Sequence, residues 1–155
     1  MEMRVILIRS IDFVSLKIVK HEDIVINIPR LTDHLTAIGV FQDQIGNADR
    51  ECFGVVCLDS KGFPTNYSLA HIGTLNNTLI SNREIFKVAV KSNASSIIVA
   101  HNHPSGDVTP SDDDVRYTKD IIEAGRTLGI QVLDHIIVSD EEGKSIRSCY
   151  PHIFD

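Results

Sequence analysis

The strongest structural signal in this chain is the stretch Ser95-Ser96-Ile97-Ile98-Val99-Ala100-His101-Asn102-His103-Pro104. Residues 95–100 form a short run rich in β-branched side chains, which is typical of a strand at the centre of a sheet. The chemistry then changes within one residue, because two histidines, a proline and Gly106 follow, and Pro and Gly mark a loop. We therefore predict a central strand that delivers His101 and His103 to a loop at its end.

Strand and helix patterns alternate on both sides of this stretch. Residues 51–59 form a nearly continuous apolar run, which indicates a strand buried on both faces. A hairpin turn at residues 60–62 and a return strand over residues 63–74 are expected to follow it. The other predicted elements are helices over 31–44, 83–91 and from 110 to about 128, and strands over 3–8, 13–20, 23–28, 130–139 and 144–149. This alternation predicts an α/β single domain with a mixed β-sheet flanked by helices.

The composition is that of one globular domain with an acidic balance. The chain has 155 residues, and its 15 basic and 21 acidic side chains give a net charge of −6. Such a balance argues against a surface that coats nucleic acid. The three cysteines contain no C-x-x-C pair, so we expect a reducing, cytoplasmic compartment. No segment approaches the ~20 apolar residues of a membrane span, so we expect no membrane association.

Chemistry concentrates in a pattern that begins with His101-x-His103 and ends with Ser111-x-x-Asp114. Alternate side chains of an extended segment point the same way, so both imidazoles can reach one ion. Asp114 is predicted to lie in the first turn of the next helix. Two imidazoles and a carboxylate match a catalytic zinc site that keeps a fourth position open. Ser111 and Asp114 also read as a helix capping box, and acidic residues at a helix start are explained by its dipole.

The spacing of His101, His103, Ser111 and Asp114 resembles the JAMM motif of the MPN+ metalloprotease superfamily. The string from residue 101 to residue 107 is similar to that of its bacterial RadC-type branch, as are the blocks at 73–76, 83–86, 93–100 and 133–137. The resemblance covers about residues 49–148. It implies a JAB/MPN, cytidine-deaminase-like fold over residues 31–155. Residues 1–30 would then be an N-terminal extension, expected to form strands packed on or beside the domain.

The resemblance also implies a function, namely a zinc-dependent metallohydrolase that cleaves an amide or peptide bond in a peptide or protein substrate. His101, His103 and Asp114 would hold Zn²⁺, which activates a water molecule. Glu51 would be the general base and Ser111 would steady the oxyanion. From the residues alone, Glu51 reads as a solvated side chain at a strand start. Its rival Glu84 reads as an ion-paired residue in the first turn of a helix.

Two other functions remain open at the level of sequence. One is a binding module in a DNA-repair or mobile-element complex in which the metal is structural, and the other is a metal-dependent nuclease. Residues 1–30 carry five basic and four acidic side chains, whereas residues 31–155 carry ten and 17, so charge does not support DNA association. The pair Asp134-His135 allows a carboxylate that supports a metal-bound imidazole. A structural pair in a strand is the simpler interpretation.

Overall fold

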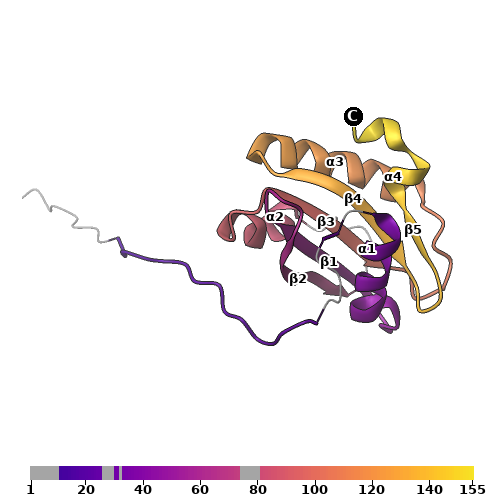
Figure 1. Cartoon of the computed structure of the whole chain (residues 1–155), viewed down its shortest axis with the longest axis horizontal. Helices are drawn as coiled ribbons and strands as arrows, with labels where there is room; N and C mark the ends of the chain where they lie inside the picture. Colours follow the sequence, from indigo (N-terminus) through magenta and orange to yellow (C-terminus); the bar gives the residue numbers. More distant parts are fainter. Residues whose placement is uncertain (1–10, 26–29, 32, 74–80) are drawn as a thin grey trace, which may run out of the picture.

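The computed structural model describes residues 11–25, 30–31, 33–73 and 81–155 (Figure 1). Its centre is a five-stranded sheet in the order β2-β1-β3-β4-β5. Strands β3 and β4 are parallel and the other neighbouring pairs are antiparallel, so the sheet is mixed, as predicted. The strands are β1 (Glu51–Leu58), β2 (Pro64–Gly73), β3 (Ser96–Asn102), β4 (Gln131–Val138) and β5 (Gly143–Ser145).

Helices cover both faces of this sheet (Figure 1). Helices α2 (Asn82–Lys91) and α3 (Asp112–Leu128) share one apolar core with the sheet. Helix α1 (His34–Phe41) shares a second core with the other face. Three short elements complete the domain, namely the π-helical turn η1 (Gln42–Gly46), α4 (Ile146–Cys149) and the 3-10 turn η2 (Pro151–Ile153). The fold class predicted from sequence is confirmed.

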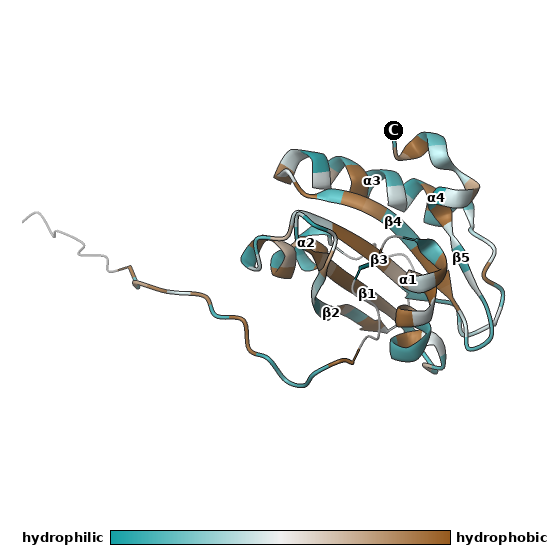
Figure 2. Ribbon diagram, viewed as in Figure 1, coloured by the Kyte–Doolittle hydropathy of each residue, from teal (hydrophilic) through white to brown (hydrophobic). Residues whose placement is uncertain are grey.

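The alternation of side chains explains why the central strands are apolar throughout. In β1, Phe53 and Val55 pack in the core beneath α2 and α3, whereas Cys52 and Val56 pack in the core beneath α1. A strand buried on both faces needs apolar residues at every position. Figure 2 shows this pattern in the mostly brown colour of the central strands β1, β3 and β4, whereas the helices beside them mix teal, white and brown. By the same alternation, His101 in β3 lies on the α3 face of the sheet, opposite Phe53 of β1.

Helix α3 has strong boundary signals at both ends. Ser111 is the N-cap of a complete capping box with Asp114, so two backbone N–H groups that would otherwise lack a partner are satisfied. The helix ends at Gly129, whose φ of 70° is left-handed and suits a residue without a Cβ atom. The capping box predicted from sequence is therefore present. It fixes the first turn of α3, where Asp114 lies.

Most predicted elements are present with small shifts at their ends, but the strand predicted over residues 144–149 is present only at its first two residues, because residues 146–149 form a helix. Strand β5 stops at Ser145, because that side chain accepts a hydrogen bond from the N–H of Ser148 and starts helix α4. The predicted helix over residues 31–44 begins only at His34, after the N-cap Asp33. The helix predicted over residues 83–91 begins one residue earlier, at Asn82, and Ser81 is its N-cap.

The N-terminal stretch also differs from the prediction. Residues 11–25 contain neither helix nor strand, and the side chains of Ile11 and Phe13 are exposed. The strand expected over residues 13–20 is therefore wrong, because no strand of the described sheet pairs with it. The strand expected over residues 3–8 lies outside the described residues, as do residues 26–28 of the strand expected over 23–28, whereas residues 23–25 contain no strand. Among the helices that are described, none is long and apolar enough to cross a membrane.

Two glycines test how closely the helices pack on the sheet. A Cβ atom added to Gly125 of α3 would lie 2.5 Å from the carbonyl oxygen of Ile130, whereas one added to Gly39 of α1 would meet nothing within 4 Å. We predict that Gly125→Ala lowers the free energy of unfolding by ~1–3 kcal/mol through overpacking. Gly39→Ala should leave it unchanged or raise it by up to ~1 kcal/mol, because alanine favours helix.

Urea unfolding followed by circular dichroism measures both variants against the parent protein. Equal unfolding midpoints for the two alanine variants would contradict the close contact between α3 and the start of β4.

Candidate metal centre

The two histidines of the H-x-H pattern lie where β3 ends. His101 is buried within β3, and His103 follows the strand and is partly exposed. The ring of Phe53 lies parallel to that of His101, with their centroids 6.3 Å apart. This packing holds His101 against β1 with its Nε2 atom toward the start of α3. The loop over residues 103–111 then returns the chain to the first turn of α3, where Asp114 lies.

The structure brings His101, His103 and Asp114 together. The two Nε2 atoms are 2.9 Å apart, Asp114 Oδ1 is 3.2 Å from His101 Nε2, and Asp114 Oδ2 is 3.9 Å from His103 Nε2. Within the described part of the chain, they form the one group of at least three His, Cys, Asp or Glu residues with potential ligand atoms within 4.8 Å of one another. The three predicted metal ligands are therefore adjacent in space.

The spacing and chemistry of this group fit a divalent transition-metal ion. In a tetrahedral zinc site, bonds of ~2.0–2.1 Å place neighbouring ligand atoms about 3.3 Å apart. The three measured distances lie on both sides of this value, so small side-chain movements would satisfy it. The side chain of His101 is 2% exposed, whereas those of His103 and Asp114 are 20% and 15% exposed. The group is thus partly accessible from solvent through His103 and Asp114.

The hydrogen bond behind His103 determines which nitrogen faces this group. His103 Nδ1 lies 2.6 Å from the backbone carbonyl oxygen of Asp107. A carbonyl can only accept, so His103 donates through Nδ1–H. In a neutral imidazole, Nε2 then carries a lone pair, and this lone pair lies next to His101 and Asp114. Such an arrangement is usual for metal-binding histidines.

Asp114 is held as a carboxylate by its neighbours. Burial on its own would raise the pKa of Asp114, but its polar contact with the His101 imidazole, together with hydrogen bonds from Ser111, outweighs this effect. The pKa of Asp114 consequently lies well below its ordinary value. The backbone N–H and the hydroxyl of Ser111 both donate to Asp114 Oδ2, at 2.8 and 2.7 Å. In this conformation the Ser111 hydroxyl is engaged within the capping box.

Glu51 is the first residue of β1 and is partly buried. It lies two residues before Phe53, which pairs with His101 across the sheet. Because side chains two residues apart in a strand point the same way, Glu51 and His101 lie on the same face of the sheet. Continuing the same antiparallel register places Glu51 level with His103. The rival Glu84 lies on α2, with its carboxylate 2.6 Å from Lys87 Nζ. Glu51 is therefore placed at the end of the sheet where the candidate metal-binding group of His101, His103 and Asp114 lies.

His135 contacts His101 in a way that the sequence did not reveal. It is fully buried in β4, and its Nε2 atom lies 2.8 Å from His101 Nδ1. Burial, followed by the charge of His101, holds the pKa of His135 well below its ordinary value. Asp134, which the sequence suggested as a supporting carboxylate, instead accepts hydrogen bonds from Ser145 Oγ and the N–H of Arg147. The contact between His135 and His101 depends on the pairing of β3 with β4, which the sequence pattern does not show.

Asn102, between the two histidines, fixes the segment that precedes β1. Its Oδ1 atom accepts from the N–H of Cys52 at 2.6 Å, and its Nδ2 atom donates to the carbonyls of Ala48 and Arg50. Asn102 is therefore hydrogen-bonded to the backbone of both residues next to Glu51, namely Arg50 and Cys52. The sequence could have indicated a structural role for Asn102, because alternation along a strand points its side chain away from the face that the two histidines share.

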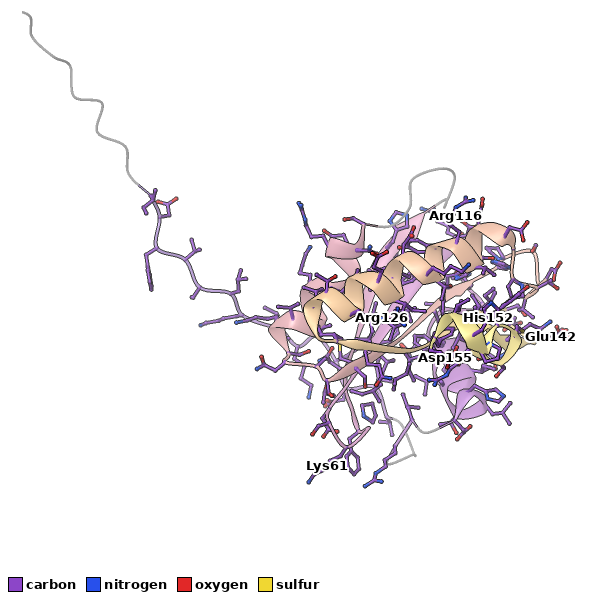
Figure 3. The ribbon with its side chains drawn as sticks, turned by 90° about the horizontal axis from the view of Figure 1, so that it is seen from above. Lys61, Arg116, Arg126, Glu142, His152 and Asp155 are labelled. Atoms are coloured by element: carbon purple, nitrogen blue, oxygen red, sulfur yellow. The ribbon has the colours of Figure 1, made fainter. Side chains whose placement is uncertain are left out.

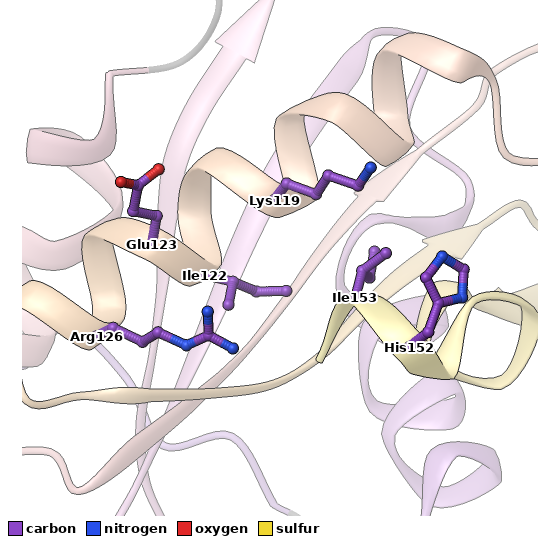
Figure 4. Close-up of a pocket in the computed structure, with 6 residues that line it drawn as sticks. All are labelled: Lys119, Ile122, Glu123, Arg126, His152 and Ile153. Carbon is purple, nitrogen blue, oxygen red and sulfur yellow. The ribbon is translucent and has the colours of Figure 1, made fainter. Parts of the chain in front are cut away.

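A separate hollow of about 550 Å³ lies between α3 and η2 (Figure 4). Arg126 on its margin donates to the carbonyl oxygen of Asp155, and Figure 3 shows α3 beside the C-terminal segment. None of the three candidate ligands lines this hollow. Its lining residues are Lys119, Ile122, Glu123, Arg126, His152 and Ile153.

Comparison with known proteins agrees with this geometry. Residues 31–150 match the family model for the RadC-like JAB domain, and the chain belongs to this family. Its relatives include UPF0758 proteins from Desulforamulus reducens, Staphylococcus carnosus and Desulfitobacterium hafniense. The first is 44% identical over 110 residues, which are 71% of this chain and 48% of the relative. The second is 43% identical over 111 residues, or 72% and 49%.

The relative from Desulfitobacterium hafniense is 41% identical over 123 residues, which are 79% of this chain and 52% of the relative. The chain therefore spans about half the length of the curated relatives it matches. The resemblance to the RadC-type branch is confirmed, and the family supports a metal-dependent fold of the JAMM type. The names of these relatives state no activity.

Asp113 and Asp114 provide a matched test of the metal centre. We predict that the protein binds one Zn²⁺ per chain and that Asp114→Asn weakens this binding by at least about tenfold, because one of three ligands loses its charge. Asp113→Asn should bind as the parent does, because the Asp113 carboxylate pairs with Arg116 on the outside of α3. Competition with a chromophoric chelator measures both affinities. Equal affinities for the two variants would contradict the assignment of Asp114.

Proposed function

We propose that this domain is a zinc-dependent hydrolase of the JAMM type that cleaves amide bonds in peptides or proteins. The observation that carries the proposal is the convergence of His101, His103 and Asp114 beside the strand end that holds Glu51. Membership of the RadC-like JAB family supports a metal-dependent site at this position. The partly exposed side of the group supports access for an extended substrate.

The three ligands have complementary roles in this proposal. His101 and His103 bind as neutral imidazoles through Nε2, and Asp114 contributes a negative charge through its carboxylate. When bound, a zinc ion supplies Lewis acidity that makes a water molecule acidic near neutral pH. Such a donor set, with three protein ligands, is that of catalytic rather than structural zinc sites.

Glu51 is proposed as the group that moves the proton. Its carboxylate takes a proton from the attacking water and then delivers it to the nitrogen of the leaving amine, so the amide bond is cleaved without a net change at Glu51. Its position on the same sheet face as His101 supports this role. The hydrogen bonds of Asn102 to Cys52 and Arg50 support it further, because they fix the backbone on both sides of Glu51.

Ser111 is proposed to stabilise the negative charge that develops on the carbonyl oxygen of the substrate. Rotation of its hydroxyl away from Asp114 Oδ2 would let it donate to that oxygen. The N-terminus of α3 lies at the same place, and its backbone N–H groups favour negative charge. Ser111 thus has a capping role in the structure and a proposed catalytic role in the reaction.

Glu51 and Glu84 form the matched pair that tests the hydrolase. We predict that Glu51→Gln retains zinc but loses amide cleavage by at least about a hundredfold, because general-base catalysis contributes about 10²–10⁴-fold. Glu84→Gln should retain both properties. Incubation of the zinc-loaded full chain with a peptide library, read by mass spectrometry, measures cleavage.

The same preparations distinguish the alternative functions. A zinc-loaded protein that cleaves no amide but binds duplex DNA with a strong salt dependence would favour a binding module over a hydrolase. Metal-dependent cleavage of DNA, lost in Glu51→Gln, would favour a nuclease. Either result would contradict the proposed amide hydrolysis.

Two substitutions separate the roles of Ser111. We predict that Ser111→Ala lowers the free energy of unfolding by ~1 kcal/mol, whereas Ser111→Gly lowers it by only a few tenths, because glycine is a tolerable N-cap. Both should lower kcat for amide cleavage by a similar factor of at least about ten, because both lack the hydroxyl. If kcat instead follows stability across the two variants, the hydroxyl serves only as a cap.

A further inference from the structure

A buried chain of hydrogen bonds lies behind His101, on the side away from the metal-binding group. His101 Nδ1 is 2.8 Å from His135 Nε2, and His135 Nδ1 is 2.7 Å from Thr118 Oγ1. Thr118 Oγ1 in turn lies 2.6 Å from the backbone carbonyl oxygen of Asp114. The side chains of His135 and Thr118 are fully buried. This series of hydrogen bonds therefore joins β3, β4 and α3, and it ends at the backbone of Asp114, a proposed metal ligand.

The direction of every proton in this chain follows from its last member. The carbonyl oxygen of Asp114 can only accept, so the single hydroxyl proton of Thr118 is donated to it. Thr118 Oγ1 must then accept from His135, which places a proton on His135 Nδ1. A neutral His135 has a lone pair on Nε2 and accepts from His101 Nδ1–H. Nε2 of a neutral His101 is left with its lone pair toward the metal-binding group.

We propose that His135 and Thr118 are positioning residues that hold His101 in the tautomer with its proton on Nδ1. This inference rests on the proposed metal site but not on any particular substrate. In the other tautomer, the proton on Nε2 of His101 would occupy the position of the ion. The hydroxyl of Thr118 carries this constraint from the first turns of α3 to the end of β3, so the orientation of His101 is coupled to the placement of Asp114.

A packing role alone makes a different prediction. The ring of Phe53 contacts both imidazoles, with centroids 6.3 Å from His101 and 5.6 Å from His135. If His135 only filled space beside Phe53, any apolar side chain of similar size would serve. The positioning role instead requires an acceptor for His101 Nδ1–H, and it requires an oxygen at residue 118 that accepts from His135.

The decisive variants are Thr118→Val, which replaces the hydroxyl with a methyl group, and Thr118→Ser, which keeps it. In the metal-free full chain labelled with ¹⁵N-histidine, long-range ¹H–¹⁵N spectra report the tautomer of each ring. We expect His101 of the parent and of Thr118→Ser to be protonated on Nδ1. Thr118→Val should populate the Nε2–H tautomer of His101, because His135 Nδ1 loses its acceptor and its proton can move to Nε2.

Zinc affinity gives the second readout. We expect Thr118→Val to weaken Zn²⁺ binding by about tenfold or more, the range found when hydrogen-bond partners of metal ligands are removed. Thr118→Ser should bind close to the parent. His135→Leu should weaken binding similarly, whereas His135→Gln should restore part of it, because its amide oxygen can accept from His101. Circular dichroism identifies variants that fail to fold. If the His135 variants fail to fold, the comparison of Thr118→Val with Thr118→Ser still tests the inference.

The outcomes separate this inference from the proposed function. A parent protein that binds no zinc contradicts the proposed function, and the tautomer of His101 in the metal-free protein still decides the inference. The inference is overturned if the parent carries the Nε2–H tautomer of His101. It is equally overturned if Thr118→Val keeps both the parental tautomer and the parental zinc affinity. In that last case the zinc site of the proposed function stands.

Discussion

The contact between His101 Nε2 and the carboxylate of Asp114 is the interaction on which the rest of the site depends. It joins the end of the central strand β3 to the first turn of α3 across 3.2 Å. Both sides are fixed independently, since β3 lies between β1 and β4 and α3 is held by a complete capping box. The Nε2 atom of His103 is the third potential ligand atom, and it lies beside His101 Nε2 and the carboxylate of Asp114. A positive ion is the partner that this concentration of lone pairs and charge favours.

Asp114 connects local helix formation with the chemistry of the site. One carboxylate oxygen accepts from the backbone and hydroxyl of Ser111, and the other faces His101. The capping box therefore fixes the position of a proposed metal ligand at the same time as it starts the helix. This double role explains how the sequence pattern allowed both a structural and a functional interpretation of Ser111 and Asp114. The structure supports the first directly and arranges the residues for the second.

The sequence predicted those features that depend on local spacing and not those that depend on register. The H-x-H pattern at a strand end and Asp114 in a first helical turn follow from the periodicities of strand and helix. The contact of His135 with His101 depends on the parallel pairing of β3 with β4, whose register shifts between Ile97 and Ile98. The strand predicted over residues 144–149 was wrong beyond Ser145 because Ser145 caps a helix, and the sequence pattern does not reveal that competition.

The most direct test of a zinc site built from two imidazoles and a carboxylate is X-ray absorption spectroscopy at the zinc edge of the zinc-loaded full chain. The geometry predicts nitrogen and oxygen ligands only, at ~2.0–2.1 Å, with the multiple-scattering signature of two imidazoles. Asp114→Asn should alter this spectrum and Asp113→Asn should not. A sulfur ligand at ~2.3 Å, or a shell without imidazole scattering, would contradict the site formed by His101, His103 and Asp114.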